Sequence, residues 1–351
     1  MKYQHVENVP NINSWEIIDN NCYYASGNLV KVIGKEVSIP IPLPYWGVEF
    51  NPSFFNVFTN RSVNTFFNYQ GKVINTFEEK DFYYYFSDSS FIYYDRVSKR
   101  LMYNDLELLR GKMLSFYIFD DLLFFEKENK IQTINFLSGQ FLWEFSLASL
   151  GKWKNSWDEE RDFEIRHFIG IYNRIIWAFI EIGGFIGLDI ETGELKYRIP
   201  EYDEAIGKTI CKGKDFFRSD YFLNSEKGKI LGMAMDVFIE IDLSQEPPFV
   251  TQYGLQEEFE KYNIKGKDTS TKYAVKDNLL YFYLFDQLRF GILDINTKEI
   301  IYISEPIAVV ERDDCFTQLK DLKVSENKVY ILDSNHTLHI FEREEQLKIT
   351  T

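Results

Sequence analysis

The sequence is poor in the residues that most often carry out chemistry. It contains 3 cysteines and 4 histidines in 351 residues. Cys22, Cys211 and Cys315 are too far apart for a CxxC pair or a disulfide framework. His336 and His339, three residues apart on an expected strand, would point to opposite faces and make poor joint metal ligands. We therefore expect no metal and no bound cofactor.

Familiar catalytic motifs are missing as well. The chain has no Gly-x-Ser-x-Gly elbow, no Walker loop and no His-Glu-x-x-His helix. Gly183, Gly184 and Gly187 miss the first position of a dinucleotide-binding loop, because Ile182 stands there. These absences favour a protein without catalytic activity.

Long apolar runs are also lacking. The longest are the length of a strand, well below the ~20 residues that a membrane helix requires. The first ten residues contain no apolar stretch resembling a signal peptide. Only 9 prolines and 19 glycines are present, which excludes a disordered or collagen-like chain. We expect a soluble, cytoplasmic protein that does not associate with membranes.

Negative charge and aromatic rings are what the chain has in excess. Its 54 acidic and 39 basic residues give a net charge of −15, which repels nucleic acid and favours a basic protein partner. Phe, Trp and Tyr make up 17% of the residues, with 32 Phe and 23 Tyr. Because aromatic side chains suit a pleated, half-buried surface, this bias indicates an all-β fold.

A repeat organises most of the chain. Its clearest copy is residues 182–197, read as a strand ending at Asp189, a turn at 191–193 and a second strand ending at Tyr197. Periods of about 40–50 residues with four short strands each are typical of β-propeller blades. Equivalent positions recur at intervals of about 40–54 residues, at Asp95, Asn135, Asp189, Asp242, Asp294 and Phe341.

Two further positions of the repeat support this interpretation. Four residues after the reference position stand residues suited to a tight turn, namely Lys99, Gly139, Gly193, Glu246 and Lys298. Eight residues after it stand apolar or aromatic residues, namely Tyr103, Trp143, Tyr197, Val250, Tyr302 and Ile349. The whole chain, residues 1–351, is thus expected to form one β-propeller domain.

The first eighty residues fit the repeat less well. Weak copies occur at Val30 and Phe67, but Phe67 lies too close to Asp95 for a complete four-stranded blade between them. We therefore expect seven four-stranded blades, with six or eight as alternatives. Residues 22–39 are expected to complete the last blade, so that strands from the two ends of the chain close the ring.

Residues 187–197, Gly-Leu-Asp-Ile-Glu-Thr-Gly-Glu-Leu-Lys-Tyr, resemble the repeat of quinoprotein-like (PQQ-type) and WD40-like β-propeller proteins. The resemblance implies that an aromatic residue of each blade docks against the next blade, a role for Tyr103, Trp143, Tyr197 and Tyr302. The quinone dehydrogenases of this family bind their cofactor beside adjacent cysteines, which this chain lacks. The resemblance therefore covers the structural repeat and not the enzymatic activity.

Function is expected in the parts that do not repeat. Two insertions stand out, 150–162 with two tryptophans and several acids, and 254–270 with the acids Glu257, Glu258 and Glu260. The predicted binding residues are Trp153, Trp157, Asp158, Glu159, Glu160, Glu257 and Glu258. They favour a non-catalytic binding propeller, in its most specific form an acidic immunity-type inhibitor of a basic toxin.

The alternative is a carbohydrate-active enzyme, a glycoside hydrolase or lyase, with carboxylates in the central funnel. Such an enzyme requires two acids roughly 5–10 Å apart in a deep central pocket with a stacking aromatic nearby. Carboxylates at blade turns supply the candidates, namely Asp120, Asp121, Asp286, Asp313 and Asp314.

Overall fold

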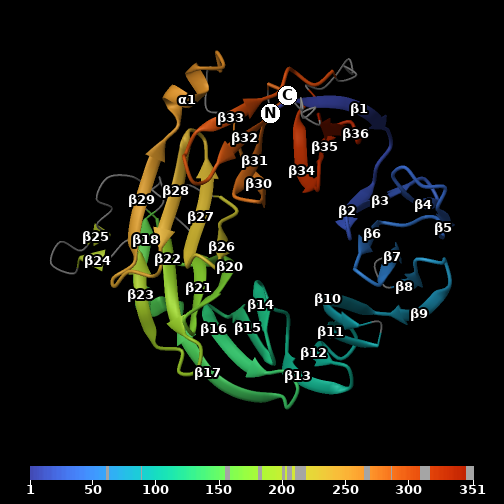
Figure 1. Cartoon of the computed structure of the whole chain (residues 1–351). Helices are drawn as coiled ribbons and strands as arrows, with labels where there is room; N and C mark the ends of the chain where they lie inside the picture. Colours follow the sequence, from blue (N-terminus) through green and yellow to red (C-terminus); the bar gives the residue numbers. More distant parts are fainter. Residues whose placement is uncertain are drawn as a thin grey trace.

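Eight blades of four antiparallel strands surround a common centre (Figure 1). The computed structural model describes residues 1–60, 63–87, 89–154, 159–180, 184–199, 202–203, 208–209, 219–264, 269–285, 287–308 and 317–344. The β-propeller is confirmed, but the expected seven blades are corrected to eight within these residues. The central strands of several neighbouring blades contact one another, as β2 and β6 or β14 and β20 do, and β34 contacts β2 where the ring closes.

Each blade is a meander whose strands run in order from the centre outward, except at the point of closure. The first four blades are β2 (Ser14–Ile18), β3 (Asn21–Ser26), β4 (Leu29–Val32) and β5 (Ser38–Pro40); β6 (Gly47–Phe50), β7 (Phe54–Asn60), β8 (Val63–Asn68) and β9 (Val73–Glu78); β10 (Lys80–Ser87), β11 (Ser90–Asp95), β12 (Arg100–Tyr103) and β13 (Leu106–Arg110); and β14 (Phe116–Phe119), β15 (Leu122–Lys127), β16 (Lys130–Asn135) and β17 (Gln140–Ser146). The last four are β20 (Ile165–Tyr172), β21 (Ile175–Ile180), β22 (Gly184–Asp189) and β23 (Leu195–Ile199); β26 (Phe222–Asn224), β27 (Lys229–Ala234), β28 (Val237–Asp242) and β29 (Phe249–Gly254); β30 (Thr269–Lys276), β31 (Leu279–Leu284), β32 (Arg289–Asp294) and β33 (Ile300–Ile303); and β34 (Leu319–Ser325), β35 (Lys328–Asp333), β36 (Leu338–Arg343) and β1 (Tyr3–Val9).

The N-terminal strand closes the ring. β1 pairs antiparallel with β36 as the outer strand of the last blade, and the two strands lie side by side in Figure 1. The ring of Tyr3 packs against Phe290 of the neighbouring blade at 5.7 Å. Residues 22–39, expected to complete the last blade, instead supply β3, β4 and part of β5 of the blade that follows it.

Antiparallel alternation gives the propeller two distinct faces. The connection from the outer strand of one blade to the central strand of the next always opens on the same face, together with the turn between second and third strands. We call this the insertion face; it includes connections 41–46, 111–115 and 147–164 and helix α1 (Gln256–Glu260). The opposite face, made by the turns between first and second and between third and fourth strands, is the hairpin face.

Aspartate and asparagine shape the hairpin turns of the repeat. Asp189 Oδ1 accepts hydrogen bonds from the backbone N–H groups of Glu191 and Thr192, both at 2.9 Å. Asn135, Asp242 and Asp294 make the same kind of turn, which an Asx side chain stabilises by replacing a backbone acceptor.

Four residues after the Asx residue of the turn, the backbone is left-handed at Gly139, Gly193 and Lys298. This conformation explains why glycine recurs at that position of the repeat. Asp95 differs, because it ends the second strand of its blade rather than the third.

The core lies in the seams between blades. Trp143 on β17 is buried, and its indole N–H donates to the backbone oxygen of Ile190 in the next blade at 2.9 Å. Tyr103 likewise packs on Phe136 of the next blade at 5.1 Å, and Tyr302 on Tyr3 at 5.4 Å. The terminal aromatics of the repeat therefore dock onto the neighbouring blade, as the resemblance implies.

Candidate interaction face

The most exposed apolar side chains gather on the insertion face. Among the described residues, the four large hydrophobic side chains with the greatest exposure are Val97 (77%), Leu114 (76%), Trp46 (70%) and Leu43 (64%). All four lie in connections or turns of that face, over the first four blades. Apolar groups held out into solvent on one side of a molecule are a common mark of an interaction site.

The turns that carry Val97 and Leu114 are tied together. The backbone N–H of Gly111 donates to Lys99 O at 3.0 Å, which joins the turn 96–99 to the connection 111–115. Asp81 links the turn to the connection, because its carboxylate accepts hydrogen bonds from Arg96 Nε at 2.9 Å and from Lys112 Nζ at 3.3 Å.

Burial alone would raise the pKa of the Asp81 carboxyl. The hydrogen bonds from Arg96 and Lys112 outweigh it and hold the pKa below its usual value. Asp81 is therefore an anion that fixes two neighbouring turns.

The connection 41–46 is fixed at both ends. Ile41 N–H donates to Asn28 O at 2.9 Å, and Trp46 N–H donates to Phe58 O at 2.7 Å. Pro42 and Pro44 restrict the backbone between them. The segment thus displays Leu43 and Trp46 with little conformational freedom. Sequence reasoning missed both, although an apolar residue between two prolines, followed by tryptophan in a connection, is a usable signal.

The first predicted insertion forms a two-stranded hairpin, β18 (Lys152–Lys154) with β19 (Glu160–Asp162). Trp153 is half-buried, packs against the adjoining core and donates its indole N–H to Asp162 O at 3.1 Å. Glu159 pairs with Arg161 at 2.7 Å, and Glu160 lies 3.8 Å from Lys152. Trp153 therefore supports the hairpin, and basic neighbours offset both acids. Trp157 and Asp158 lie outside the described residues.

The second predicted insertion contains α1, which Phe259 anchors in the core. Glu258 pairs with Lys261 at 2.5 Å and accepts the backbone N–H of Ile300 at 3.2 Å, so it holds the helix against β33. Glu257 is exposed. The two predicted acidic groups share the insertion face but stand over different seams, with the β20–β23 and β26–β29 blades between them.

Of the five carboxylates suggested for glycoside chemistry, two lie within the described residues. Asp120 and Asp121 form the turn between β14 and β15 on the hairpin face, where Asp120 is left-handed. Asp286, Asp313 and Asp314 lie outside the described residues, so the alternative stays a prediction.

On the central strands, Glu16 of β2 pairs with Lys323 of β34 at 2.7 Å. Burial raises the pKa of Asp321, also on β34, and Lys323 partly opposes that shift. Lys323 therefore offsets the charge of Glu16 and of Asp321 on the central strands.

Within the described ranges, His, Cys, Asp and Glu form no group of three or more suited to a metal ion. In that same part of the chain, no helix combines the length and apolar character needed to cross a bilayer.

Comparison with known proteins gives the fold. No family model matches the chain, and no curated protein does. BamB from Moraxella catarrhalis matches with a TM-score of 0.57 and 11% identity, over 97% of this chain and 100% of its own. The computationally designed Ika8 protein matches with a TM-score of 0.54 and 11% identity, over 96% of this chain and 98% of its own. The chain is therefore a β-propeller that resembles quinoprotein-like and WD40-like proteins in its structural repeat.

Proposed function

We propose that this propeller is a non-catalytic, protein-binding module whose insertion face holds the partner. The observation that carries the proposal is the placement of Leu43, Trp46, Val97 and Leu114 on fixed turns of that one face. Protein interfaces draw most of their binding energy from a few such anchors surrounded by polar groups. Rigid turns reduce the entropy lost when a partner binds.

The partner is a basic protein with an apolar patch. The net charge of −15 attracts basic surfaces, and acidic residues of the insertions lie on the same face as the apolar turns. The immunity-type inhibitor of a basic toxin is the most specific form of this proposal. It requires in addition that the propeller abolish the partner's toxic activity when the two are mixed.

The test uses matched variants on the two faces. Partners captured from the source cell by the wild-type chain are purified and titrated against Trp46→Ser/Leu114→Ser and against Leu137→Ser, an exposed residue on the hairpin face. We expect the double variant to bind at least about tenfold more weakly, because interface anchors contribute about 2 kcal/mol each. Equal binding by the double variant, or loss with Leu137→Ser alone, would overturn the proposal.

A further inference from the structure

A polar cavity with an aromatic floor opens on the hairpin face, between the β20–β23 and β26–β29 blades. Its volume is about 340 Å³, within the lower range of small-molecule sites. Tyr172, Trp177 and Tyr197 contribute rings to it, and Asn173, Gln245 and Glu246 contribute polar groups. It lies on the opposite face from the proposed protein-binding surface.

The floor depends on a glycine. The rings of Trp177 and Tyr197 stack at a centroid distance of 5.5 Å and an angle of 12°. On the adjacent strand stands Gly187, where a Cβ would come within 3.1 Å of Tyr197 and 3.2 Å of Trp177. Trp177 is 1% exposed, and its indole N–H has no acceptor in the described part of the chain.

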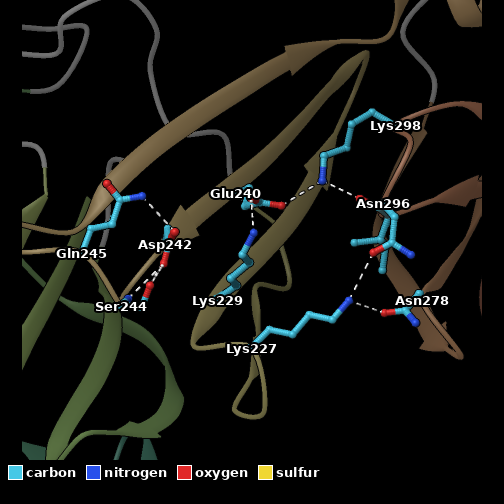
Figure 2. A network of polar contacts seen from close by, with 10 residues as sticks. Lys227, Lys229, Glu240, Asp242, Ser244, Gln245, Asn278, Asn296 and Lys298 are labelled. Carbon is cyan, nitrogen blue, oxygen red and sulfur yellow. Dashed lines mark hydrogen bonds and ion pairs between the residues drawn. The ribbon is translucent and has the colours of Figure 1, made fainter.

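The opposite wall is held rigidly. Asp242 accepts hydrogen bonds from Ser244 Oγ at 2.6 Å and Gln245 Nε2 at 2.9 Å, and these bonds lie at the left of Figure 2. Glu246 accepts the Tyr197 hydroxyl at 2.6 Å, which connects this wall to the floor. The cavity is thus shaped before any ligand enters.

The blade behind that wall is fixed in turn. Glu240 bridges Lys229 at 2.7 Å and Lys298 of the next blade at 2.8 Å. Lys227 donates to Asn278 at 2.7 Å across the same seam (Figure 2). These bonds resist any displacement of the turn 243–246.

We propose that this cavity binds a neutral sugar unit. Hydroxyl groups both donate and accept, which matches the amides of Asn173 and Gln245 and the carboxylate of Glu246. The C–H face of a pyranose ring packs on an aromatic face, a role for Tyr197. Lys196, the cation beside the cavity, is paired with Glu194 at 2.6 Å, so the site does not select an anion. Among the described residues that line the cavity, Glu246 is the one carboxylate, whereas glycoside hydrolysis uses two, so we expect the ligand to be bound rather than cleaved.

The experiment is saturation-transfer NMR followed by titration of the full chain with glucose, galactose, N-acetylglucosamine, maltotriose and chitotriose. We expect at least one sugar to bind with a Kd in the millimolar range or below. Tyr197→Ala and Gln245→Ala weaken that binding about tenfold or more, while Tyr197→Phe, which keeps the ring, changes it less. The control is Tyr302→Ala, an aromatic at the equivalent repeat position that packs on Tyr3 in another seam.

Two results would overturn the proposal. One is the absence of saturation transfer from every probe at about 10 mM, tenfold above a millimolar Kd. The other is equal binding by the wild type and by folded Tyr197→Ala and Gln245→Ala. Insertion-face variants such as Trp46→Ser leave sugar binding unchanged, so failure here is separate from failure of the protein-binding proposal.

Discussion

The first four blades and the last four each contain four strands, but the number of residues between equivalent strands differs between the two sets. Third strands end about 35 residues apart in the first set and about 50 residues apart in the second. The positions are Val32, Asn68, Tyr103 and Asn135, then Asp189, Asp242, Asp294 and Arg343. In the first set, β9 and β10 are separated by Glu79 alone, whereas residues 147–164 separate β17 from β20. The extra length therefore lies on the insertion face, while the blades stay alike.

In the closed ring the two sets meet at two seams, and the largest effect is expected at the seam between the β14–β17 and β20–β23 blades. Trp143 projects from the last short blade and packs over Gly193 of the first long blade. Its indole N–H donates a hydrogen bond to the backbone oxygen of Ile190 in that blade. Trp143→Ala would leave a large cavity and an unpaired carbonyl, lowering the free energy of unfolding by about 3–5 kcal/mol. Urea denaturation measures this change. Trp46→Ala, at a 70% exposed position, is the control and should cost less than about 0.5 kcal/mol. Similar losses in the two variants would contradict the docking role.

The long blades were predictable from the sequence, as was the short β14–β17 blade, whose third strand ends at Asn135; the other short blades were not. Asp189, Asp242 and Asp294 each end a third strand with an Asx turn, so the repeat is visible as sequence. The equivalent positions Val32 and Tyr103 carry no such signal.

Asp95 makes an Asx turn too, because its carboxylate accepts hydrogen bonds from the backbone N–H groups of Val97 and Ser98. This turn follows the second strand of its blade, so an Asx turn alone does not identify a third strand. Aligning Asp95 with Asp189 compares different strands and hides one blade. This is the physical reason for expecting seven blades where eight are present.

Long-range pairing and side-chain burial also lay beyond the sequence. β1 pairs with β36 across almost the full length of the chain, and no local pattern distinguishes such a strand from one that pairs nearby. For the candidate site, acidic composition pointed to the insertions, but it could not show that Glu258 holds β33 or that Trp153 turns inward. Those outcomes depend on neighbours that only the folded ring brings together.

The seam between the β14–β17 and β20–β23 blades also contains a buried acid. This acid makes the folding stability depend on pH. Glu126 is 2% exposed and accepts the backbone N–H of Ile165 from the next blade. Burial raises its pKa to about 7, with Glu164 adding to the shift. In the unfolded chain the group ionises near 4.5, so folding stability falls as pH rises from about 4.5 to 7 and is level above that.

Glu126→Gln removes that dependence while keeping an acceptor for Ile165. We expect the variant to match the wild type below about pH 4.5 and to exceed its free energy of unfolding by about 3 kcal/mol above pH 7. Urea denaturation across this pH range measures the difference. A constant offset between the two proteins at every pH would show that Glu126 does not titrate between the two states.

Two glycines with the same φ angle, one in each set of blades, allow a direct comparison of the two sets. Gly34 in the first blade and Gly193 in the first long blade both have φ of 71°. A Cβ at Gly34 would meet nothing within 4 Å, whereas one at Gly193 would lie 2.4 Å from Trp143. Both alanine variants incur left-handed strain, but only Gly193→Ala also overpacks the seam. We expect Gly193→Ala to be less stable than Gly34→Ala by about 1–2 kcal/mol in thermal unfolding. Equal losses would mean that Trp143 moves aside at no cost.

The smallest effect on stability is expected in the insertion that lengthens the second set. Glu159 and Glu160 pair with Arg161 and Lys152 on an exposed hairpin, and such pairs contribute about 0.2–1 kcal/mol. Glu159→Gln/Glu160→Gln should therefore lower the free energy of unfolding by less than about 1 kcal/mol, and less still at high salt. If the insertion face attracts a basic partner, the same change slows association severalfold at low salt. Stopped-flow mixing with the captured partner measures that rate.

The control for this last variant is Glu226→Gln, which removes an exposed acid from the hairpin face. It alters net charge without altering the insertion, so it separates a local effect from the general attraction of an acidic protein. Slower association with the insertion variant alone would locate the partner on the lengthened connections. Equal slowing by both variants would mean that the whole field, and not the insertion, guides the encounter. The long connections would then owe their length to covering blade edges rather than to recognition.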